Sequence, residues 1–88
     1  MKLTGKAKEL KNQFDQQVKE LQKSMQREQV QKALDENRMD KYRFDNEAFK
    51  VAYSKLQDSF VSDIALLELR EQLSTEIYDE VHEYIMGY

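Results

Sequence analysis

Cysteine, proline and tryptophan are absent from the 88-residue sequence, and the only glycines are Gly5 and Gly87. Without cysteine the chain forms no disulfide, no zinc–thiolate site and no thiol nucleophile. Strands of β-proteins are usually joined by turns rich in glycine, proline, asparagine or aspartate. Because the 81 residues from 6 to 86 contain neither glycine nor proline, the sequence predicts an all-α fold.

Long apolar runs are also lacking. No segment approaches the ~18 apolar residues that a transmembrane helix needs, so we expect no membrane association. The first residues lack the apolar core of a secretory signal peptide. We therefore expect a cytoplasmic location.

The apolar residues that are present recur every three or four positions, most densely between Phe44 and Tyr84. This spacing places them along one stripe of a helix. The stripe contains Phe49, Tyr53, Leu56, Phe60, Ile64 and Leu67. We predict a single helical domain over residues 1–88, built as a small antiparallel bundle of three helices. A long two-helix hairpin is the alternative, and in either case we expect self-association.

The helix boundaries follow from capping residues and from breaks in the apolar pattern. The mixed-charge run 35–45 has no apolar periodicity and is the predicted turn. Asp45 or Asn46 suits the N-cap of the next helix, and Gly87 suits the C-cap of the last. The predicted helices span about 5–34, 46–58 and 62–86.

The corner between the second and third helices is predicted near residues 58–62. Ser59 and Ser62 can each cap a helix, although the apolar stripe crosses this point in phase. One helix over residues 46–86 would be ~60 Å long. A compact chain of this size has a radius of gyration of ~12 Å, which favours a corner.

Charge divides the chain into two halves. Residues 1–44 carry a net charge of +4 and residues 45–88 a net charge of −7. The halves are expected to attract one another, within a chain or between chains, with a strength that salt screens. This attraction favours an antiparallel arrangement.

Residues that carry catalytic chemistry are scarce. The only histidine is His82, and Asp79 precedes it by three positions, which resembles half of a carboxylate-bridged two-metal site. A second histidine would have to come from another chain, and an acidic solvent-facing helix explains the pattern equally simply. No glycine-rich turn is available for an oxyanion hole or a phosphate loop. We expect neither an enzyme nor a cofactor or metal.

The leading hypothesis for the function is a small helical protein-interaction module. Such a module would be an adaptor, regulator or inhibitor that binds another protein. Small helical proteins of phages and mobile elements often act this way, an analogy of size and class. Tyrosine is enriched in interface cores, and exposed apolar patches mark interfaces. We expect a homo-oligomer, with a dimer favoured. The predicted partner-binding residues are Tyr78, Tyr84, Met86, Tyr88, Glu76, Glu80 and Glu83.

Nucleic-acid association is the alternative function. The first helix is rich in lysine, and Tyr42 lies between two cations in the predicted turn, a combination that suits phosphate contact and base stacking. Against it, acids such as Glu20 and Glu28 are interleaved in the helix, and the isoelectric point is about 5.2. The predicted contacts are Lys19, Lys23, Arg27, Lys41 and Arg43.

Overall fold

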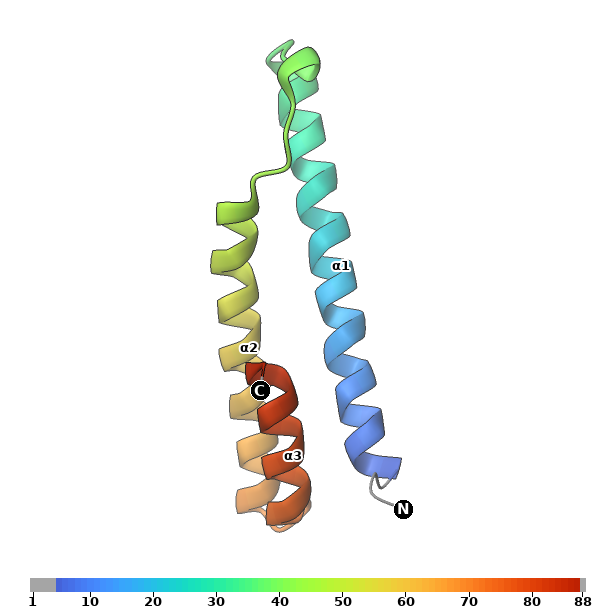
Figure 1. Ribbon diagram of the computed structural model, residues 1–88, viewed down its shortest axis with the longest axis vertical. Coiled ribbons are helices and arrows are strands. Elements are labelled where there is room, and N and C mark those ends of the chain that lie inside the picture. The colour runs from blue at the N-terminus through green and yellow to red at the C-terminus, as the bar shows by residue number, and fades with distance from the viewer. Residues whose placement is uncertain (1–4, 88) are drawn as a thin grey trace.

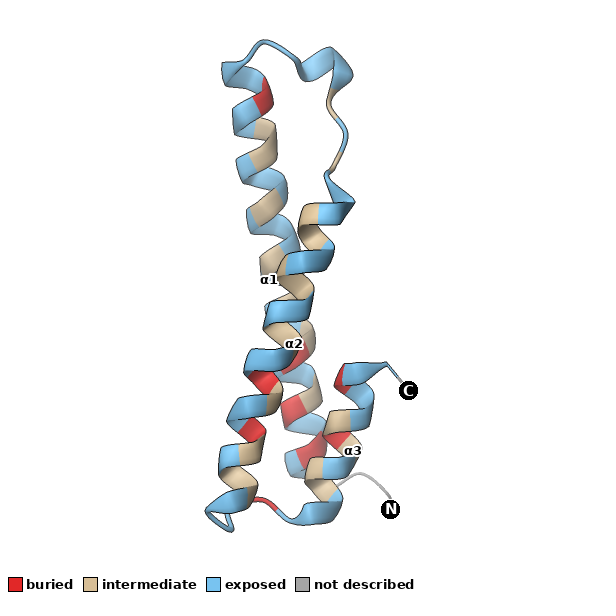
Figure 2. Cartoon of the chain, turned by 90° about the vertical axis from the view of Figure 1, so that its left-hand side faces the viewer, coloured by how far each residue is buried: buried red, intermediate tan, exposed pale blue. Residues whose placement is uncertain are grey.

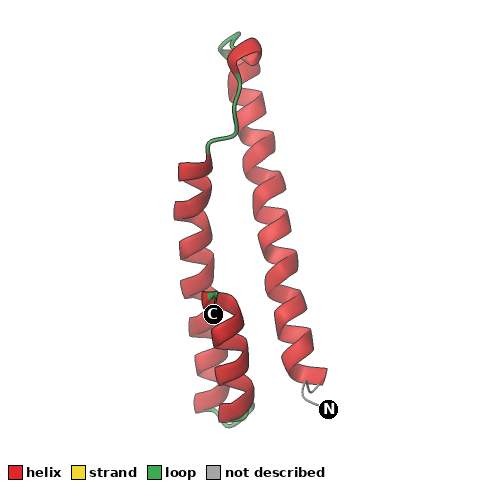
Figure 3. Cartoon of the chain, viewed as in Figure 1, coloured by secondary structure: helices red, strands yellow, loops and turns green. Residues whose placement is uncertain are grey.

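The computed structural model describes residues 5–87, which form an elongated antiparallel arrangement of helices (Figures 1 and 3). Its extents are 52 × 24 × 19 Å. The elements are α1 (Gly5–Asp35), the short 3₁₀ helix η1 (Met39–Lys41), α2 (Asn46–Leu69) and α3 (Thr75–Met86). The described residues contain no strand, so the predicted all-α bundle of three helices is confirmed.

The first helix and the turn after it match the prediction closely. Helix α1 ends at Asp35, one residue beyond the predicted limit. Asn37 then adopts a left-handed conformation with φ of 59°, which asparagine tolerates better than most residues. The N–H of Arg38 donates to the carbonyl of Ala33 at 2.8 Å and so satisfies one of the last carbonyls of the helix.

Helix α2 begins as predicted but continues past the expected corner. The Asp45 carboxylate accepts from the N–H of Ala48 at 3.1 Å and caps the helix. The predicted boundary at 58–62 is wrong, because α2 runs without interruption to Leu69. An unbroken helix keeps the in-phase apolar stripe directed at the core. Ser59 and Ser62 lie in the middle of α2, and their side chains are exposed to solvent.

The true corner lies at residues 70–74, after the apolar stripe ends. Glu71 takes a left-handed φ of 62°, and the N–H of Gln72 donates to the carbonyl of Leu67 at 2.8 Å. Ser74 then caps α3 by accepting from the N–H of Ile77 at 3.2 Å. At the far end Gly87 forms the predicted C-cap with φ of 86°. The third helix therefore begins at Thr75 and not at residue 62.

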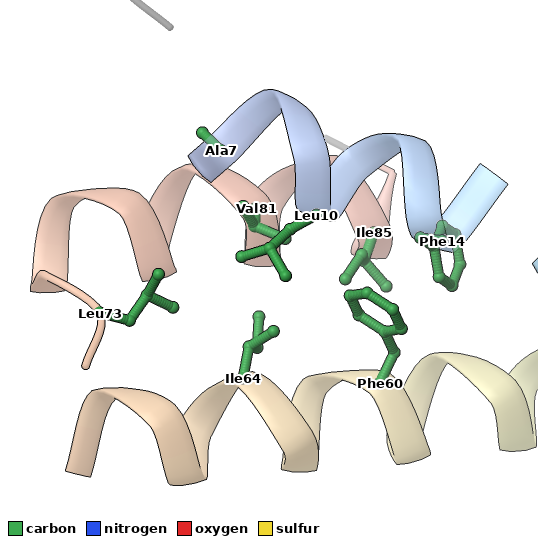
Figure 4. Close-up of a cluster of buried hydrophobic side chains, with 8 residues drawn as sticks. All are labelled: Ala7, Leu10, Phe14, Phe60, Ile64, Leu73, Val81 and Ile85. Atoms are coloured by element: carbon green, nitrogen blue, oxygen red, sulfur yellow. The ribbon is translucent and has the colours of Figure 1, made fainter. Parts of the chain in front are cut away.

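The buried core occupies one end of the molecule, where all three helices meet (Figure 2). Side chains from each helix point into a common centre (Figure 4). Ile64, Val81 and Ile85 are almost completely inaccessible to solvent. Each apolar side chain removed from water in this way stabilises the fold by roughly 1.5–3 kcal/mol. The cluster consists of Ala7, Leu10, Phe14, Phe60, Ile64, Leu73, Val81 and Ile85.

The other end of the molecule is a two-helix hairpin, because α3 is short. The side-chain amide of Gln57 donates to the carbonyl of Ile85 at 2.8 Å, which marks where α3 ends beside α2. We call residues 19–56 the distal half. Within it Ala33 is the only buried residue. A row of aromatic contacts at 5.4–6.0 Å links this half to the core through Phe44, Phe49, Tyr53, Phe14 and Phe60.

Candidate interaction surfaces

The predicted partner-binding residues of α3 divide between internal contacts and free surface. Tyr78 is half-buried, packs against the core and lies with its ring 5.7 Å from that of His82. Glu80 and Tyr84 both contact α1. Glu76, Glu83 and Met86 remain exposed, and Tyr88 lies outside the described residues. Of the described members of the set, Tyr78, Glu80 and Tyr84 make contacts inside the chain, although Tyr84 is still 43% exposed.

The contacts of Glu80 and Tyr84 form a polar seam between α1 and α3. The Lys11 Nζ lies 2.9 Å from a carboxylate oxygen of Glu80. The Tyr84 hydroxyl donates to the carboxylate of Asp15, with its two oxygens at 2.7 and 2.8 Å. Lys11 also lies 5.4 Å from the centre of the Tyr84 ring, within cation–π range. Part of the expected attraction between the basic and acidic halves thus acts within the chain.

This seam perturbs the protonation of Tyr84. The hydrogen bond to Asp15 raises the pKa of the Tyr84 hydroxyl above its usual value, because the donated proton is lost on ionisation. Burial of the hydroxyl and the negative charge of Asp15 raise it further. The raised pKa has a structural cause, since each contribution comes from the contact of α3 with α1. The seam therefore fixes α3 on α1 through polar contacts.

A different surface stands out on α2, on the side turned away from α1 and α3. We call it the α2 outer face: Val51, Lys55, Asp58, Ser62, Ala65 and Leu69. Leu69 is 78% exposed and Val51 is 57% exposed. Leu66, adjacent to this face, is 47% exposed. Apolar side chains this exposed are candidates for contact with another protein.

The α2 outer face was not predicted, although the sequence contains a signal for it. Its members are separated by steps of four, three, four, three and four residues, the heptad spacing of helices that pack side by side. The stronger stripe through Phe60 and Ile64 lies on the opposite side and dominates the pattern. The polar residues at the centre of the outer face conceal the second stripe.

The predicted nucleic-acid contacts also divide into two groups. Lys19, Lys23 and Arg27 lie exposed along α1. Lys41 and Arg43 lie in the connection between α1 and α2, where they line a hollow of about 310 Å³. Lys32 and Arg38, which were not singled out from the sequence, line the same hollow. The basic cluster in the structure therefore differs from the predicted one. It contains Lys32 and Arg38 in addition to Lys41 and Arg43, and it does not include Lys19, Lys23 or Arg27.

Asp79 and His82, the half of a two-metal site suggested by the sequence, gain no further ligands among the described residues. Among residues 5–87, no group of three or more histidine, aspartate or glutamate side chains is placed to hold a metal ion. His82 is half-buried beside the Tyr78 ring. The His82 ring therefore packs beside the Tyr78 ring.

Comparison with protein-family models, curated proteins and solved structures gives no match to this chain. None of the described helices combines the length and the apolar character needed to cross a bilayer.

Proposed function

We propose that the chain is a small helical protein-interaction module whose principal contact surface is the α2 outer face. The observation that carries the proposal is the exposure of Leu69 and Val51 at the two ends of one heptad-spaced face that no other helix covers. Burying exposed apolar area is favourable by about 25 cal/mol per Å². A partner helix laid along this face would bury both ends at once.

The occupant that fits this face best is a second copy of the chain, in antiparallel orientation. An antiparallel two-fold pairing that sets Val51 beside the partner's Leu69 also sets Asp58 beside the partner's Ser62. A carboxylate then meets a hydroxyl donor, twice by symmetry. A parallel pairing would instead place Lys55 against Lys55 and Asp58 against Asp58, and like charges in contact are unfavourable.

We expect the dimer to be weak and concentration-dependent. The face offers only Val51, Ala65 and Leu69, with Leu66 at its edge, as apolar contacts. Obligate dimers bury much larger and more apolar surfaces. Such a module exchanges partners readily, as adaptors and regulators do.

The test is the solution mass, measured by light scattering on a sizing column over a range of concentrations. The wild-type chain should shift from monomer to dimer as concentration rises. Leu69→Glu should hold the chain as a monomer, because two carboxylates would face the partner's apolar ends. The matched control is Leu34→Glu on α1, where the native side chain is 55% exposed but lies off the α2 outer face. A wild-type chain that stays monomeric throughout, or a control that dissociates equally, contradicts the proposal.

Pairing direction has its own test, because the chain contains no cysteine. The single variants Val51→Cys and Leu69→Cys are oxidised separately and then as a mixture. An antiparallel dimer should give an inter-chain disulfide in the mixture and little in either variant alone. Cross-linking of each variant with itself would indicate parallel pairing and reject the arrangement.

Dimerisation through α2 leaves the solvent side of α3 available for a different protein. Glu76, Glu83 and Met86 remain exposed there, so the surface suits a basic partner with an apolar contact. A partner purified with the wild-type chain should be lost with Glu76→Lys combined with Glu83→Lys. It should be retained with Leu34→Glu, and the dimer mass should be unchanged in both cases.

A further inference from the structure

We propose that the hollow beside the connection between α1 and α2 is a binding site for a phosphoryl group. The connection lies at the end of the molecule remote from the core (Figures 1 and 2). Four cationic side chains line the hollow: Lys32, Arg38, Lys41 and Arg43. The proposal stands apart from the α2 outer face and does not depend on dimerisation.

Hydrogen bonds fix the backbone that carries these exposed cations. The N–H of Lys41 donates to the carbonyl of Arg38 at 3.0 Å, and that of Tyr42 donates to Met39 at 3.2 Å, which closes the 3₁₀ turn. The N–H of Asp45 donates to the side-chain carbonyl of Gln29 at 2.8 Å and fastens the end of the connection to α1. A site assembled before its ligand arrives loses less entropy on binding.

The charges around the hollow are not balanced from within the chain. Asp45 is the only acid that lines it, and its carboxylate is already engaged as the cap of α2. Arg38 pairs with Glu36 at 2.7 Å. In the described part of the chain, Lys32, Lys41 and Arg43 form no ion pair. This is a notable excess of cations in a chain whose net charge is −3.

An anion is the ligand that such a cluster favours, and a phosphoryl group fits it better than a single carboxylate. Guanidinium groups bind phosphate oxygens through paired hydrogen bonds, and lysine adds mobile positive charge. A phosphoryl group offers three acceptor oxygens to Arg43, Lys41 and Lys32. The volume of about 310 Å³ lies at the lower end of the range for small-molecule sites. There is room for a phosphate and part of what carries it.

The phosphoryl group can belong to a small molecule or to the end of a nucleic-acid strand, and the experiment separates the two. The full chain, labelled with ¹⁵N, is titrated with inorganic phosphate at constant ionic strength while the amide resonances are recorded. A second titration uses a single-stranded oligonucleotide with a 5′-phosphate. With phosphate we expect saturable shifts confined to residues near 29–45. With the oligonucleotide the same residues should shift, and further shifts along α1 should appear only if the strand continues there.

The variants decide the outcome. Lys41→Gln with Arg43→Gln should weaken phosphate binding by about tenfold or more, because charged hydrogen bonds to the ligand are removed. Lys19→Gln with Lys23→Gln removes the same charge from exposed positions on α1 and should leave phosphate binding unchanged. Weaker oligonucleotide binding in this second variant, with phosphate binding intact, would identify a strand that continues along α1. Oligonucleotide binding no tighter than phosphate and unaffected by this variant would identify a small phosphorylated molecule.

Two results would overturn the proposal. The first is a linear drift of resonances without saturation. The second is equal loss of phosphate binding in both charge-removal variants, which would show that total charge and not the hollow attracts the anion. Circular dichroism of each variant verifies that the helices are intact.

Discussion

The hydroxyl of Tyr84 lies 2.7 Å from a carboxylate oxygen of Asp15, although the two residues are 69 positions apart in the chain. Together with the ion pair between Lys11 and Glu80, this hydrogen bond links the first and last helices through polar groups. The hydrogen bond is lost when the tyrosine ionises, so it raises the pKa of Tyr84, and the negative charge of Asp15 adds to the effect.

Stability should therefore fall in alkaline solution in a way that Tyr84 controls. A group whose pKa is raised by folding contributes stability that is complete below its unfolded pKa, here about 10, and lost as the pH rises through the folded value. The difference in unfolding free energy between the wild-type chain and Tyr84→Phe should be constant from pH 7 to about 9 and should shrink above about pH 10. Urea denaturation at several pH values measures it. A difference that does not change up to pH 11 would contradict the assignment.

Tyr42 should respond to the same substitution with the opposite sign. Its hydroxyl is buried and has no hydrogen-bond partner among the described residues. Leaving a buried polar group unpaired costs about 1–3 kcal/mol, so Tyr42→Phe should raise the free energy of unfolding by about 1 kcal/mol. Tyr84→Phe at pH 7 should lower it by about 0.5–1 kcal/mol, because a made hydrogen bond is lost. A loss of stability in Tyr42→Phe would mean that the hydroxyl has a partner.

Glu71 holds a strained backbone conformation at the corner between α2 and α3. Its φ of 62° is one that glycine adopts freely and that costs other residues roughly 1–2 kcal/mol. Glu71→Gly should therefore stabilise the chain by about 0.5–1 kcal/mol in thermal or urea unfolding. Asn37→Gly, at φ of 59°, is the control and should gain less, since asparagine already tolerates this region. Equal gains at both sites would argue against relief of strain.

Capping residues provide a direct test of where α3 begins. Ser74→Ala removes the acceptor for the N–H of Ile77 and should cost about 1 kcal/mol of stability. Ser59→Ala changes a residue inside α2 and should be neutral or slightly stabilising, because alanine is the better helix former. Both variants are compared by urea unfolding. If Ser59→Ala were the more damaging change, the corner would lie near residue 59 after all.

Local patterns were sufficient to predict the helical class, the extent of α1 and the caps at Asp45 and Gly87. Each of these depends on residues a few positions apart. The corner could not be placed the same way, because Ser59, Ser62 and Ser74 are equivalent as local signals. Only the packing of Ile64 and Leu73 in one core selects among them. The molecule is also less compact than expected for its size, with a radius of gyration of 16.8 Å and not ~12 Å, so α2 is longer than predicted.

The candidate surfaces were predicted less well, for a related reason. The residue types at Glu80 and Tyr84 suit an interface, but the sequence alone does not reveal that Lys11 and Asp15 already occupy them. Similarly, Lys32 and Lys41 meet only because the chain reverses between them. Such contacts between distant positions are decided by the fold.

The confinement of the core to one end of the bundle has a consequence for biosynthesis. Leu10 and Phe14 are synthesised before Val81 and Ile85, which complete their packing and come only with α3. Until then the nascent chain carries its apolar stripes without a place to bury them. We therefore expect the stable structure to form in one step that requires α3, with α1 and α2 unable to complete the core before it.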